Sequence, residues 1–483
     1  MSDGAVSYGF CLVVEGRVSE AEALIDRVVE ATSDQERRLM LEAELSGWGY
    51  AGYEFPTARD RLARVTANLV GESPAERLLL GLRACDAITA GAITAADAAD
   101  LIHRGLGEGS LLSALGPESP IYMRMLIGLS QTDELDLLDR ELAAATIEAR
   151  RRGASYGLAI GSTLRGRTAW KRGQLLTAEA EARTGLEITS QIGRLRVFPF
   201  PLTLLIEVLD EAGGLDEAER PLEKHDLNGR VPPSLPYTEI LRARGQLRIT
   251  EGRLDLGIED LEEVRARLEV GVSPPPVRAN LARALVPALV HAGREYEARE
   301  IADETLRIAH AYGAPRNVAH ALRARTLTQR NGPDVDQLWE AAATYDRIGA
   351  PIELARTLID IGAALRRRRQ PAAARDPLRR ALDLARSRGA RPLAERAEHE
   401  LRAAGARPRR DRITGRDALT ATEGRIANLA IEGMTNRQIA ETLFITRKTV
   451  ESHLEHIFRK LGIHARRELE RALATEGTLA PID

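Results

Sequence analysis

A turn motif recurs through the first four hundred residues of this 483-residue chain, in steps of 37 to 41 residues. Each copy holds a turn residue, usually glycine, and about five positions later a small residue that opens a helix. An even period of this length is the signature of repeat architectures, whose units bury their apolar faces on their neighbours. The stronger copies, each given as turn residue and helix-opening residue, are Gly16 with Ala21, Gly173 with Ala178, Gly213 with Ala218, Gly252 with Gly257 and Gly293 with Ala298. The weaker copies are Gly52 with Ala58, Gly91 with Ala96, Asp133 with Leu137, Gly332 with Asp336 and Gln370 with Ala374.

Each unit between two anchors holds two amphipathic helical segments. Residues 298–306 form one of them, and a second glycine-containing turn, such as residues 312–315, leads to the next. Hydrophobic residues make up 44% of the chain and aromatic residues only 4%, so alanine and leucine must pack closely spaced helices. The pattern predicts an all-α fold over residues 1–404, an α–α superhelical solenoid of about ten helix-pair repeats. These units resemble tetratricopeptide-type repeats, although most Trp, Gly and Tyr signature positions of that family are missing here.

Residues 418–476 have a different pattern, that of a small four-helix domain. Thr420 with Glu423 and Thr435 with Gln438 read as two capping boxes, which start helices at these points. Two more helices are expected over residues 446–461 and 466–474. The apolar side chains expected to face one small core are Ile426, Leu429, Ala430, Ile439, Ala440, Leu443, Val450, Leu454, Ile457, Phe458 and Leu461. Two helices joined by a tight turn, the second with a polar outer face, predict a helix-turn-helix motif.

At these residues the chain resembles the LuxR-type DNA-binding domain of bacterial transcription regulators. The residues that carry the resemblance are Leu419, Thr420, Glu423, Gly433, Thr435, Asn436, Ile439, Ala440, Leu443, Thr449, Val450, His453, Ile457, Lys460, Leu461, Gly462 and Arg466. The resemblance covers about 58 residues. It implies that the helix over residues 446–461 lies in the major groove of double-stranded DNA.

The resemblance also assigns roles to individual side chains. It places Glu451, Ser452 and Glu455 at the base edges, where carboxylates would accept hydrogen bonds from cytosine amino groups. The expected phosphate-contacting residues are Asn436, Arg437, Thr446, Arg447, Lys448, Thr449, Arg459 and Lys460. In the family the fourth helix mediates pairing, so the expected dimerisation residues are Leu469, Ala472 and Leu473. We interpret His453 as a packing or phosphate-side residue, without a catalytic role.

Two arginine-rich segments each allow two interpretations. Residues 405–417 separate the two predicted domains and hold five arginines against two aspartates. This basic linker either contacts DNA phosphates beside the docked domain or is simply solvated. The run of four arginines at positions 366–369 either ends a helix, where cations suit the dipole, or forms a nucleic-acid or partner patch. Residues 477–483 are expected to be a tail.

Motifs that would carry enzyme or metal chemistry are missing from the sequence. No GxxxxGK[ST], HExxH or DxDxDG pattern occurs, and Cys11 and Cys85 belong to no metal-binding cluster. The many carboxylates are expected on solvated helix faces. We therefore expect no enzymatic activity, cofactor or metal. Because no run of 18 apolar residues exists, we expect no membrane span, and the low cysteine content favours the cytoplasm.

The combination resembles the C-terminal half of the large ATP-binding LuxR-type regulators, without their nucleotide-binding module. A short regulator and a fragment of a longer one both fit this pattern. We expect a sequence-specific transcription regulator whose repeats sense a signal or partner. The alternative is a helical-repeat interaction scaffold with secondary DNA binding. Promoter DNA is the main expected partner, bound by a homodimer; RNA polymerase and a protein or small-molecule effector in the repeat groove are further candidates.

Overall fold

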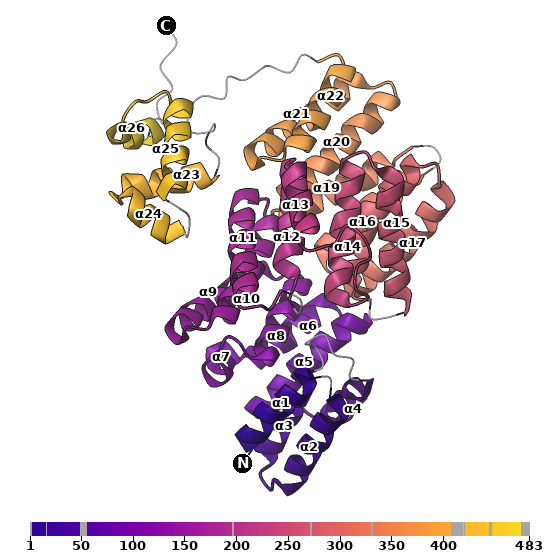
Figure 1. Ribbon diagram of the computed structural model, residues 1–483. Helices are drawn as coiled ribbons and strands as arrows, with labels where there is room; N and C mark the ends of the chain where they lie inside the picture. Colours follow the sequence, from indigo (N-terminus) through magenta and orange to yellow (C-terminus); the bar gives the residue numbers. More distant parts are fainter. Residues whose placement is uncertain are drawn as a thin grey trace.

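The computed structural model describes residues 2–15, 17–48, 56–195, 198–270, 273–329, 332–406, 419, 421–443 and 447–474. All regular secondary structure in these ranges is helical, and they contain no strand (Figure 1). The prediction of an all-α fold built from helix pairs is therefore confirmed. Thr420, Thr446, the tail 477–483 and most of the basic linker lie outside the described residues.

Ten helix pairs follow one another through the described part of the repeats. The pairs are α1 (Ser2–Val14) with α2 (Val18–Ala31), α3 (Gln35–Trp48) with α4 (Pro56–Thr66), α5 (Pro74–Ala90) with α6 (Ala95–Leu106), α8 (Pro120–Thr132) with α9 (Leu135–Arg152), α10 (Ser155–Lys171) with α11 (Leu175–Gln191), α12 (Phe200–Ala212) with α13 (Leu215–Lys224), α14 (Leu235–Thr250) with α15 (Leu254–Val270), α16 (Pro275–His291) with α17 (Glu295–Tyr312), α18 (Pro315–Leu327) with α19 (Val335–Arg347), and α20 (Pro351–Arg367) with α21 (Pro371–Arg388). The two helices of each pair lie side by side.

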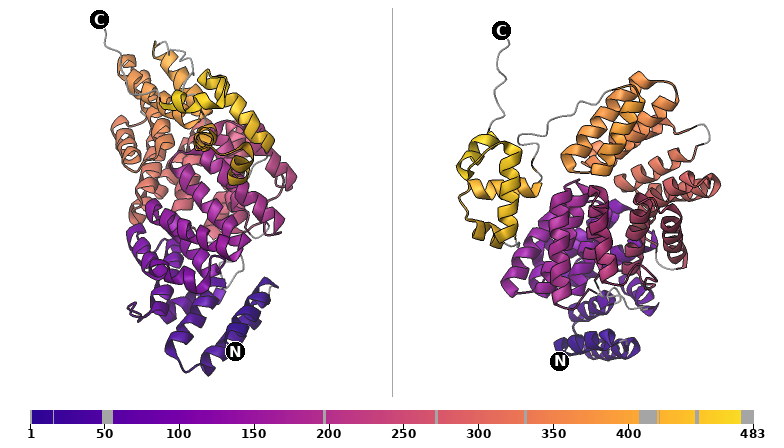
Figure 2. Two further views of the ribbon diagram at one scale, coloured as in Figure 1. Left: turned by 90° about the vertical axis from the view of Figure 1, so that its left-hand side faces the viewer. Right: turned by 45° about the horizontal axis from the view of Figure 1, so that its top comes forward.

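The remaining helices interrupt or follow this series. A 3-10 turn, η1 (Gly107–Gly109), and the short α7 (Ser110–Leu115) come between α6 and α8, and α22 (Arg391–Ala403) follows the last pair. The C-terminal helices are α23 (Ala421–Ile431), α24 (Asn436–Leu443), α25 (Arg447–Leu461), η3 (Arg466–Glu468) and α26 (Leu469–Ala474). They form a separate small bundle beside α11 (Figures 1 and 2).

The anchors of the sequence repeat coincide with the turns inside the helix pairs. Gly293, for example, has φ +76°, and the chain reverses there between α16 and α17. A left-handed residue at this point strongly favours glycine, which has no Cβ to clash. Asp133 serves the same purpose between α8 and α9 with φ +70°, a conformation that Asp and Asn tolerate better than most residues. Gly16 and Gly52 lie outside the described residues.

The small residues that follow the turns let the paired helices approach closely. They are fully buried in five repeats, at Ala21, Ala178, Ala218, Ala298 and Ala374. At Gly257, a Cβ atom would lie 2.7 Å from the backbone oxygen of Gly245, so even alanine is too large there. At the weaker anchor after Gly91, Ala96 is exposed, whereas Ala95 and Ala98 are buried. The buried small residues therefore lie on either side of the motif position in that repeat.

The stack of helix pairs winds back on itself, so that turns far apart in the sequence come into contact (Figure 2). Arg316 on α18 pairs with Asp133 after α8, with Nε 3.0 Å from Oδ1, and Tyr312 donates to the carbonyl of Gln131 at 3.0 Å. Farther along the chain, Arg356 on α20 pairs with Glu211 on α12. The Arg391 guanidinium donates to the carbonyl of Ala212 at 2.8 Å. These contacts close the inside of the superhelix along this part of the stack.

The closure corrects the expectation that the carboxylates lie on solvated helix faces. Glu207, Glu211, Glu353 and Asp360 are 3–9% exposed. Each forms an ion pair with at least one arginine on another helix. A helix face that is polar in sequence can thus face inward, because the partner charge comes from another repeat. That repeat is adjacent for Glu207, Glu353 and Asp360, and distant for Glu211. The run at 366–369 agrees with the helix-end interpretation, since Arg366 pairs with Glu400 at 2.8 Å and Arg368 donates to the carbonyl of Pro333.

We expect Ala298→Phe to destabilise the repeats by about 1–3 kcal/mol, because the fully buried anchor has no room for a phenyl ring. Urea unfolding followed by tryptophan fluorescence measures this, since Trp48, Trp170 and Trp339 all belong to the repeats. Ala96→Phe is the matched control, because Ala96 holds the same motif position but is exposed. Equal midpoints for the two variants would argue against close helix approach at the anchors.

We expect Asp133→Asn to cost about 3 kcal/mol at neutral pH, because two buried cations, Lys171 and Arg316, lose their shared carboxylate. Burial would raise the pKa of Asp133, but these two cations outweigh it and lower the pKa below its ordinary value of 3.8. The stabilisation is therefore present above about pH 5 and is lost as the pH falls through the lowered pKa. Thermal unfolding at pH 7 and pH 3 should show a difference between wild type and variant that shrinks in acid. Asp376→Asn removes an exposed pair with Arg379 and should have little effect at either pH.

Candidate nucleic-acid interface

The C-terminal bundle has the apolar core that the sequence predicts. Ile426, Ile439, Val450 and Ile457 are fully buried, and Ala430, Ala440 and Leu454 are nearly so. Leu429, Leu443, Phe458 and Leu461 pack against them as partly buried side chains. Three helices with one shared core hold α25 rigidly, so its outer face can present side chains in fixed positions.

The helix ends of this bundle follow from local chemistry. Thr435 and Gln438 form a reciprocal capping box at the start of α24: the Gln438 amide accepts from Thr435 N at 2.8 Å, and Thr435 Oγ1 accepts from Gln438 N at 3.3 Å. Gly433 and Gly462 have φ of +86° and +66°; Gly433 lies two residues after the end of α23, and Gly462 lies directly after α25.

The outer face of α25 carries exposed polar side chains at helical spacing. Ser452, Glu455 and Arg459 are exposed, whereas Val450, Leu454 and Ile457 on the opposite face are buried. The 15-residue helix is a suitable size for the major groove of B-form DNA, which admits one α-helix. This face stays exposed although α23 contacts α11 of the repeats.

The two glutamates of this face differ in their surroundings. Glu451 Oε1 accepts a hydrogen bond from Arg447 Nε at 2.8 Å, an exposed i,i+4 pair. Glu455 makes no hydrogen bond or ion pair with any described residue. The Arg447 guanidinium occupies one oxygen of the Glu451 carboxylate and partly offsets its negative charge. Glu455 is therefore the freer of the two acceptors.

The expected phosphate-contacting residues fall into three groups: those without a partner in the described ranges, those already paired within the bundle, and those outside the described residues. Arg459 is exposed and unpaired among the described residues, whereas exposed Arg437 donates to Glu441 at 2.9 Å. Asn436 uses its carbonyl oxygen to accept from Arg466 at 3.1 Å, which leaves its NH₂ group available. Thr446 and the side chains of Lys448 and Thr449 lie outside the described residues.

Lys460 has a structural contact in addition to its predicted role. Its ammonium lies 2.6 Å from Glu423 Oε2, and the Glu423 side chain is only 5% exposed. This ion pair joins α25 to α23. The capping-box pattern predicted only a local role for Glu423. Nothing in the sequence indicated that Glu423 and Lys460 are in contact.

Arg466 is a residue whose role the sequence analysis missed. Its guanidinium donates to the carbonyl of Ala430 at 3.1 Å, to the carbonyl of Met434 and to the Asn436 side chain. It therefore fixes the turn between α23 and α24 from the far side of the bundle. The only signal in the sequence was that Arg466 matches the family pattern.

The predicted dimerisation residues are unequal in exposure. Leu469 is fully buried in the domain's own core, while Ala472 and Leu473 are half-buried. A pairing surface on α26 would have to use the last two. His453 is half-buried, and burial lowers its pKa, so a neutral ring that packs is the state favoured at pH 7.

We expect Lys460→Ala to weaken the bundle by about 1–3 kcal/mol, because the nearly buried Glu423 loses its cation. Hydrogen exchange of α23 in the full chain, followed by mass spectrometry, should become faster. Arg459→Ala is the control one residue away: its exposed side chain should leave exchange unchanged and reduce the salt slope of DNA binding by about one phosphate contact. Indistinguishable exchange in the two variants would show that the Lys460 pair adds no stability.

Within the described ranges, no helix combines the length and the apolar character needed to cross a membrane. Nor do these ranges contain three or more His, Cys, Asp or Glu side chains grouped closely enough to hold a metal ion.

Among solved structures, the fold is similar to the crystal structure of Rap protein complexed with competence and sporulation factor. That likeness has a TM-score of 0.53 at 11% sequence identity, and it covers 75% of this chain and 99% of the other. At this identity it shows only that the helical-repeat fold is shared.

Three curated proteins are similar to this chain over short segments of 51 to 72 residues. A putative HTH-type transcriptional regulator of Mycobacterium tuberculosis is 39% identical over 64 residues, which is 13% of this chain and 7% of that one. The DNA-binding transcriptional activator DevR/DosR of the same species is 38% identical over 72 residues, or 15% of this chain and 31% of its own. The oxygen regulatory protein NreC of Staphylococcus aureus is 45% identical over 51 residues, or 11% and 24%.

The matched segments thus span less than half of each of these relatives, and all three are named as regulators. Residues 417–473 match the family described as bacterial regulatory proteins, luxR family. This range contains the capping box, the exposed face of α25 and the contacts of Arg466 described above. The predicted resemblance is confirmed: the chain carries a helix-turn-helix domain of the luxR family at its C-terminal end.

Proposed function

We propose that the protein is a sequence-specific DNA-binding transcription regulator, which acts in the cytoplasm where bacterial DNA lies. The observation that carries the proposal is the exposed polar face of α25, held by a packed core within the luxR-family match. Arg447 near the start of this helix and Arg459 near its end supply positive charge on either side of Glu455. Cations at both ends of a recognition helix can hold it against two phosphate strands while its centre faces the bases.

Base selection in this proposal depends on Glu455, with Ser452 and Glu451 beside it. A carboxylate only accepts hydrogen bonds, and in the major groove its natural partner is the cytosine amino group. Glu451 can contribute once Arg447 turns from it to a phosphate. Such an exchange costs little, because the exposed pair is worth at most about 1 kcal/mol.

We further propose that two copies bind DNA together through Ala472 and Leu473. Because Leu469 is buried in the core, the remaining pairing surface is small, and pairing would occur on DNA. In this proposal the repeats receive a signal from a protein or small molecule and change the affinity for DNA. Contact with RNA polymerase would link binding to transcription.

Selection of binding sites from a random DNA pool tests the proposal. The wild type should enrich one motif, with inverted half-sites about one helical turn apart, roughly 34 Å, if two copies bind. Glu455→Ala should keep or raise the affinity for non-specific DNA but relax one base pair, by roughly 1–3 kcal/mol. Glu441→Ala is the matched control, since it removes an exposed carboxylate from α24, outside the reading face.

Three outcomes would count against these proposals. Weak binding that salt abolishes, with no enriched motif, would favour the interaction scaffold. Identical motifs from wild type and Glu455→Ala would show that this carboxylate reads no base. Enrichment of a single asymmetric half-site would exclude the dimer.

A further inference from the structure

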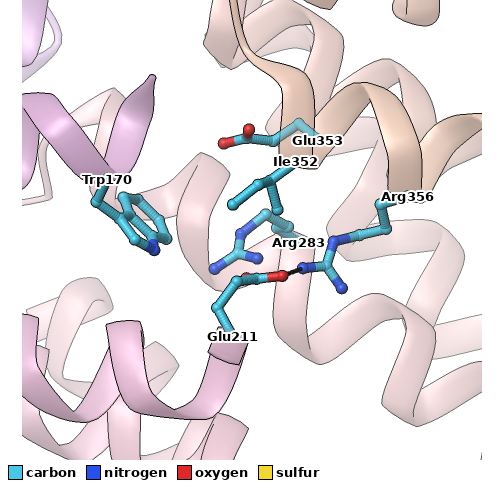
Figure 3. A pocket seen from close by; sticks show the side chains of 6 residues that line it. All are labelled: Trp170, Glu211, Arg283, Ile352, Glu353 and Arg356. Carbon is cyan, nitrogen blue, oxygen red and sulfur yellow. Dashed lines mark hydrogen bonds and ion pairs between the residues drawn. The ribbon is translucent and has the colours of Figure 1, made fainter. Parts of the chain in front are cut away.

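A cavity of about 160 Å³ lies inside the closed superhelix. Residues of α10, α12, α14, α16, α20 and α22 line it, so it is formed where distant repeats meet. Figure 3 shows the part of this region between Trp170, Glu211, Arg283 and Arg356. None of these residues belongs to the DNA-binding bundle.

Four acidic side chains around the cavity already have cationic partners, whereas Asp210, which also lines it, forms no ion pair with any described residue. Glu211 pairs with Arg356, as the dashed line in Figure 3 marks. Glu207 is shared by Arg167 and Arg242. Asp360 is likewise shared, with Arg323 at 2.6 Å and Arg396 at 2.7 Å. The Oε1 atom of Glu353 is bound to Arg316 at 3.1 Å.

Arg283 is the cation for which no acidic partner remains. It makes no hydrogen bond or ion pair with any described residue, and its Nε is buried without a partner. Its guanidinium lies near the Trp170 ring, 5.8 Å from the ring centroid. Burial lowers the pKa of Arg283, and repulsion from Arg356 adds to this effect. The Arg283 side chain is partly buried, and a partly desolvated guanidinium without a counter-charge favours an anion beside it.

Other groups around Arg283 also lack partners: two donors, and two carboxyl oxygens, Asp210 Oδ1 and Glu353 Oε2. Trp170 Nε1 and Arg356 Nε are buried donors without an acceptor. Asp210 Oδ1 is a buried oxygen without a partner, and burial beside Glu211 raises the pKa of Asp210 to about 7. Below that pH Asp210 is mostly neutral and supplies little negative charge to Arg283. The unpaired guanidinium and the two unpaired donors therefore suit an oxygen-rich anion.

We propose that this cavity is a binding site for a small organic monocarboxylate, held by Arg283 and Trp170. The carboxylate accepts hydrogen bonds from the Arg283 guanidinium and from Trp170 Nε1, and the body of the molecule lies beside the indole ring. The cavity is close in size to one of about 150 Å³ that holds benzene, so a ligand of this size fits.

Charge selects the monocarboxylate over phosphate. One guanidinium lacks a counter-ion, and Glu207 and Glu211 also line the cavity. A second negative charge on the ligand would face these carboxylates without a further free cation. A neutral molecule of the same shape would leave Arg283 uncompensated. The site therefore discriminates by charge as well as by size.

The role of this site as the signal input rests on the regulator function proposed above, while the binding itself does not. The test uses the full-length protein at pH 6.5 and sodium salts of acetate, benzoate and phenylacetate, each compared with chloride at equal ionic strength. Benzamide is the neutral counterpart of benzoate, and inorganic phosphate is the dianionic probe. Thermal unfolding, followed by tryptophan fluorescence, and titration calorimetry measure binding.

At least one monocarboxylate should raise the unfolding temperature saturably, with a dissociation constant of about 1 mM or lower. Benzamide and phosphate should bind at least about tenfold more weakly. Arg283→Met should abolish the shift, and without ligand it should unfold no earlier than wild type, because it removes a partly buried cation that has no counter-charge. Arg194→Met is the control: Arg194 also lies over an aromatic ring, that of Tyr156, but away from the cavity.

No shift with any of the three carboxylates, or an equal shift in Arg283→Met, would overturn the proposed site. Phosphate binding as tightly as the best carboxylate would overturn the ligand class. DNA mobility shifts with and without the carboxylate separate the site from its role. Carboxylate binding that leaves DNA affinity unchanged would remove the sensing role only, whereas lost DNA binding in all conditions would count against the regulator and not the cavity.

Discussion

The ion pairs that link distant repeats are the interaction on which the shape of the repeat domain depends. A stack of helix pairs has contacts only between neighbours, so small changes in tilt at each interface accumulate along the stack. Arg316 with Asp133 spans 183 residues of sequence, and Arg356 with Glu211 spans 145. Each of these pairs joins repeats that no nearest-neighbour interface connects. They fix the pitch of the superhelix and, with it, the cavity around Arg283.

Arginine is the cation that makes this closure possible. The chain has 68 lysines and arginines, of which only Lys171, Lys224, Lys448 and Lys460 are lysine. Base composition of the genome could account for this ratio, but the buried arginines exploit their shape. Arg316 binds Asp133 and Glu353 on two different elements, and Arg242 binds Glu207 and Glu239. A planar guanidinium can serve two carboxylates at once, which a lysine ammonium does less well.

Local features of the structure could be predicted from the sequence, and long-range ones could not. The turn at Gly293 requires a residue that tolerates a positive φ, and the position of Ala298 requires a small side chain. These local requirements recur in each helix pair and produce the period seen in the sequence. The capping box at Thr435 and the core around Val450 follow from spacing alone. Glu207 and Asp360, by contrast, occupy polar helix faces, and nothing within their own repeats shows that arginines from other helices cover them. Lys460 with Glu423 and the three contacts of Arg466 were missed for the same reason.

The closed superhelix also determines how a ligand could act on distant parts of the chain. A ligand shifts an equilibrium only by the difference between its affinities for the two states. An anion beside Arg283 would bind well only while α10, α12, α16 and α20 surround the cavity, so it would favour the closed arrangement over any opened one. The helix α11 belongs to the same pair as α10, and it is the helix that α23 contacts. The lining of the cavity and the contact with the C-terminal bundle thus involve the same pair of helices.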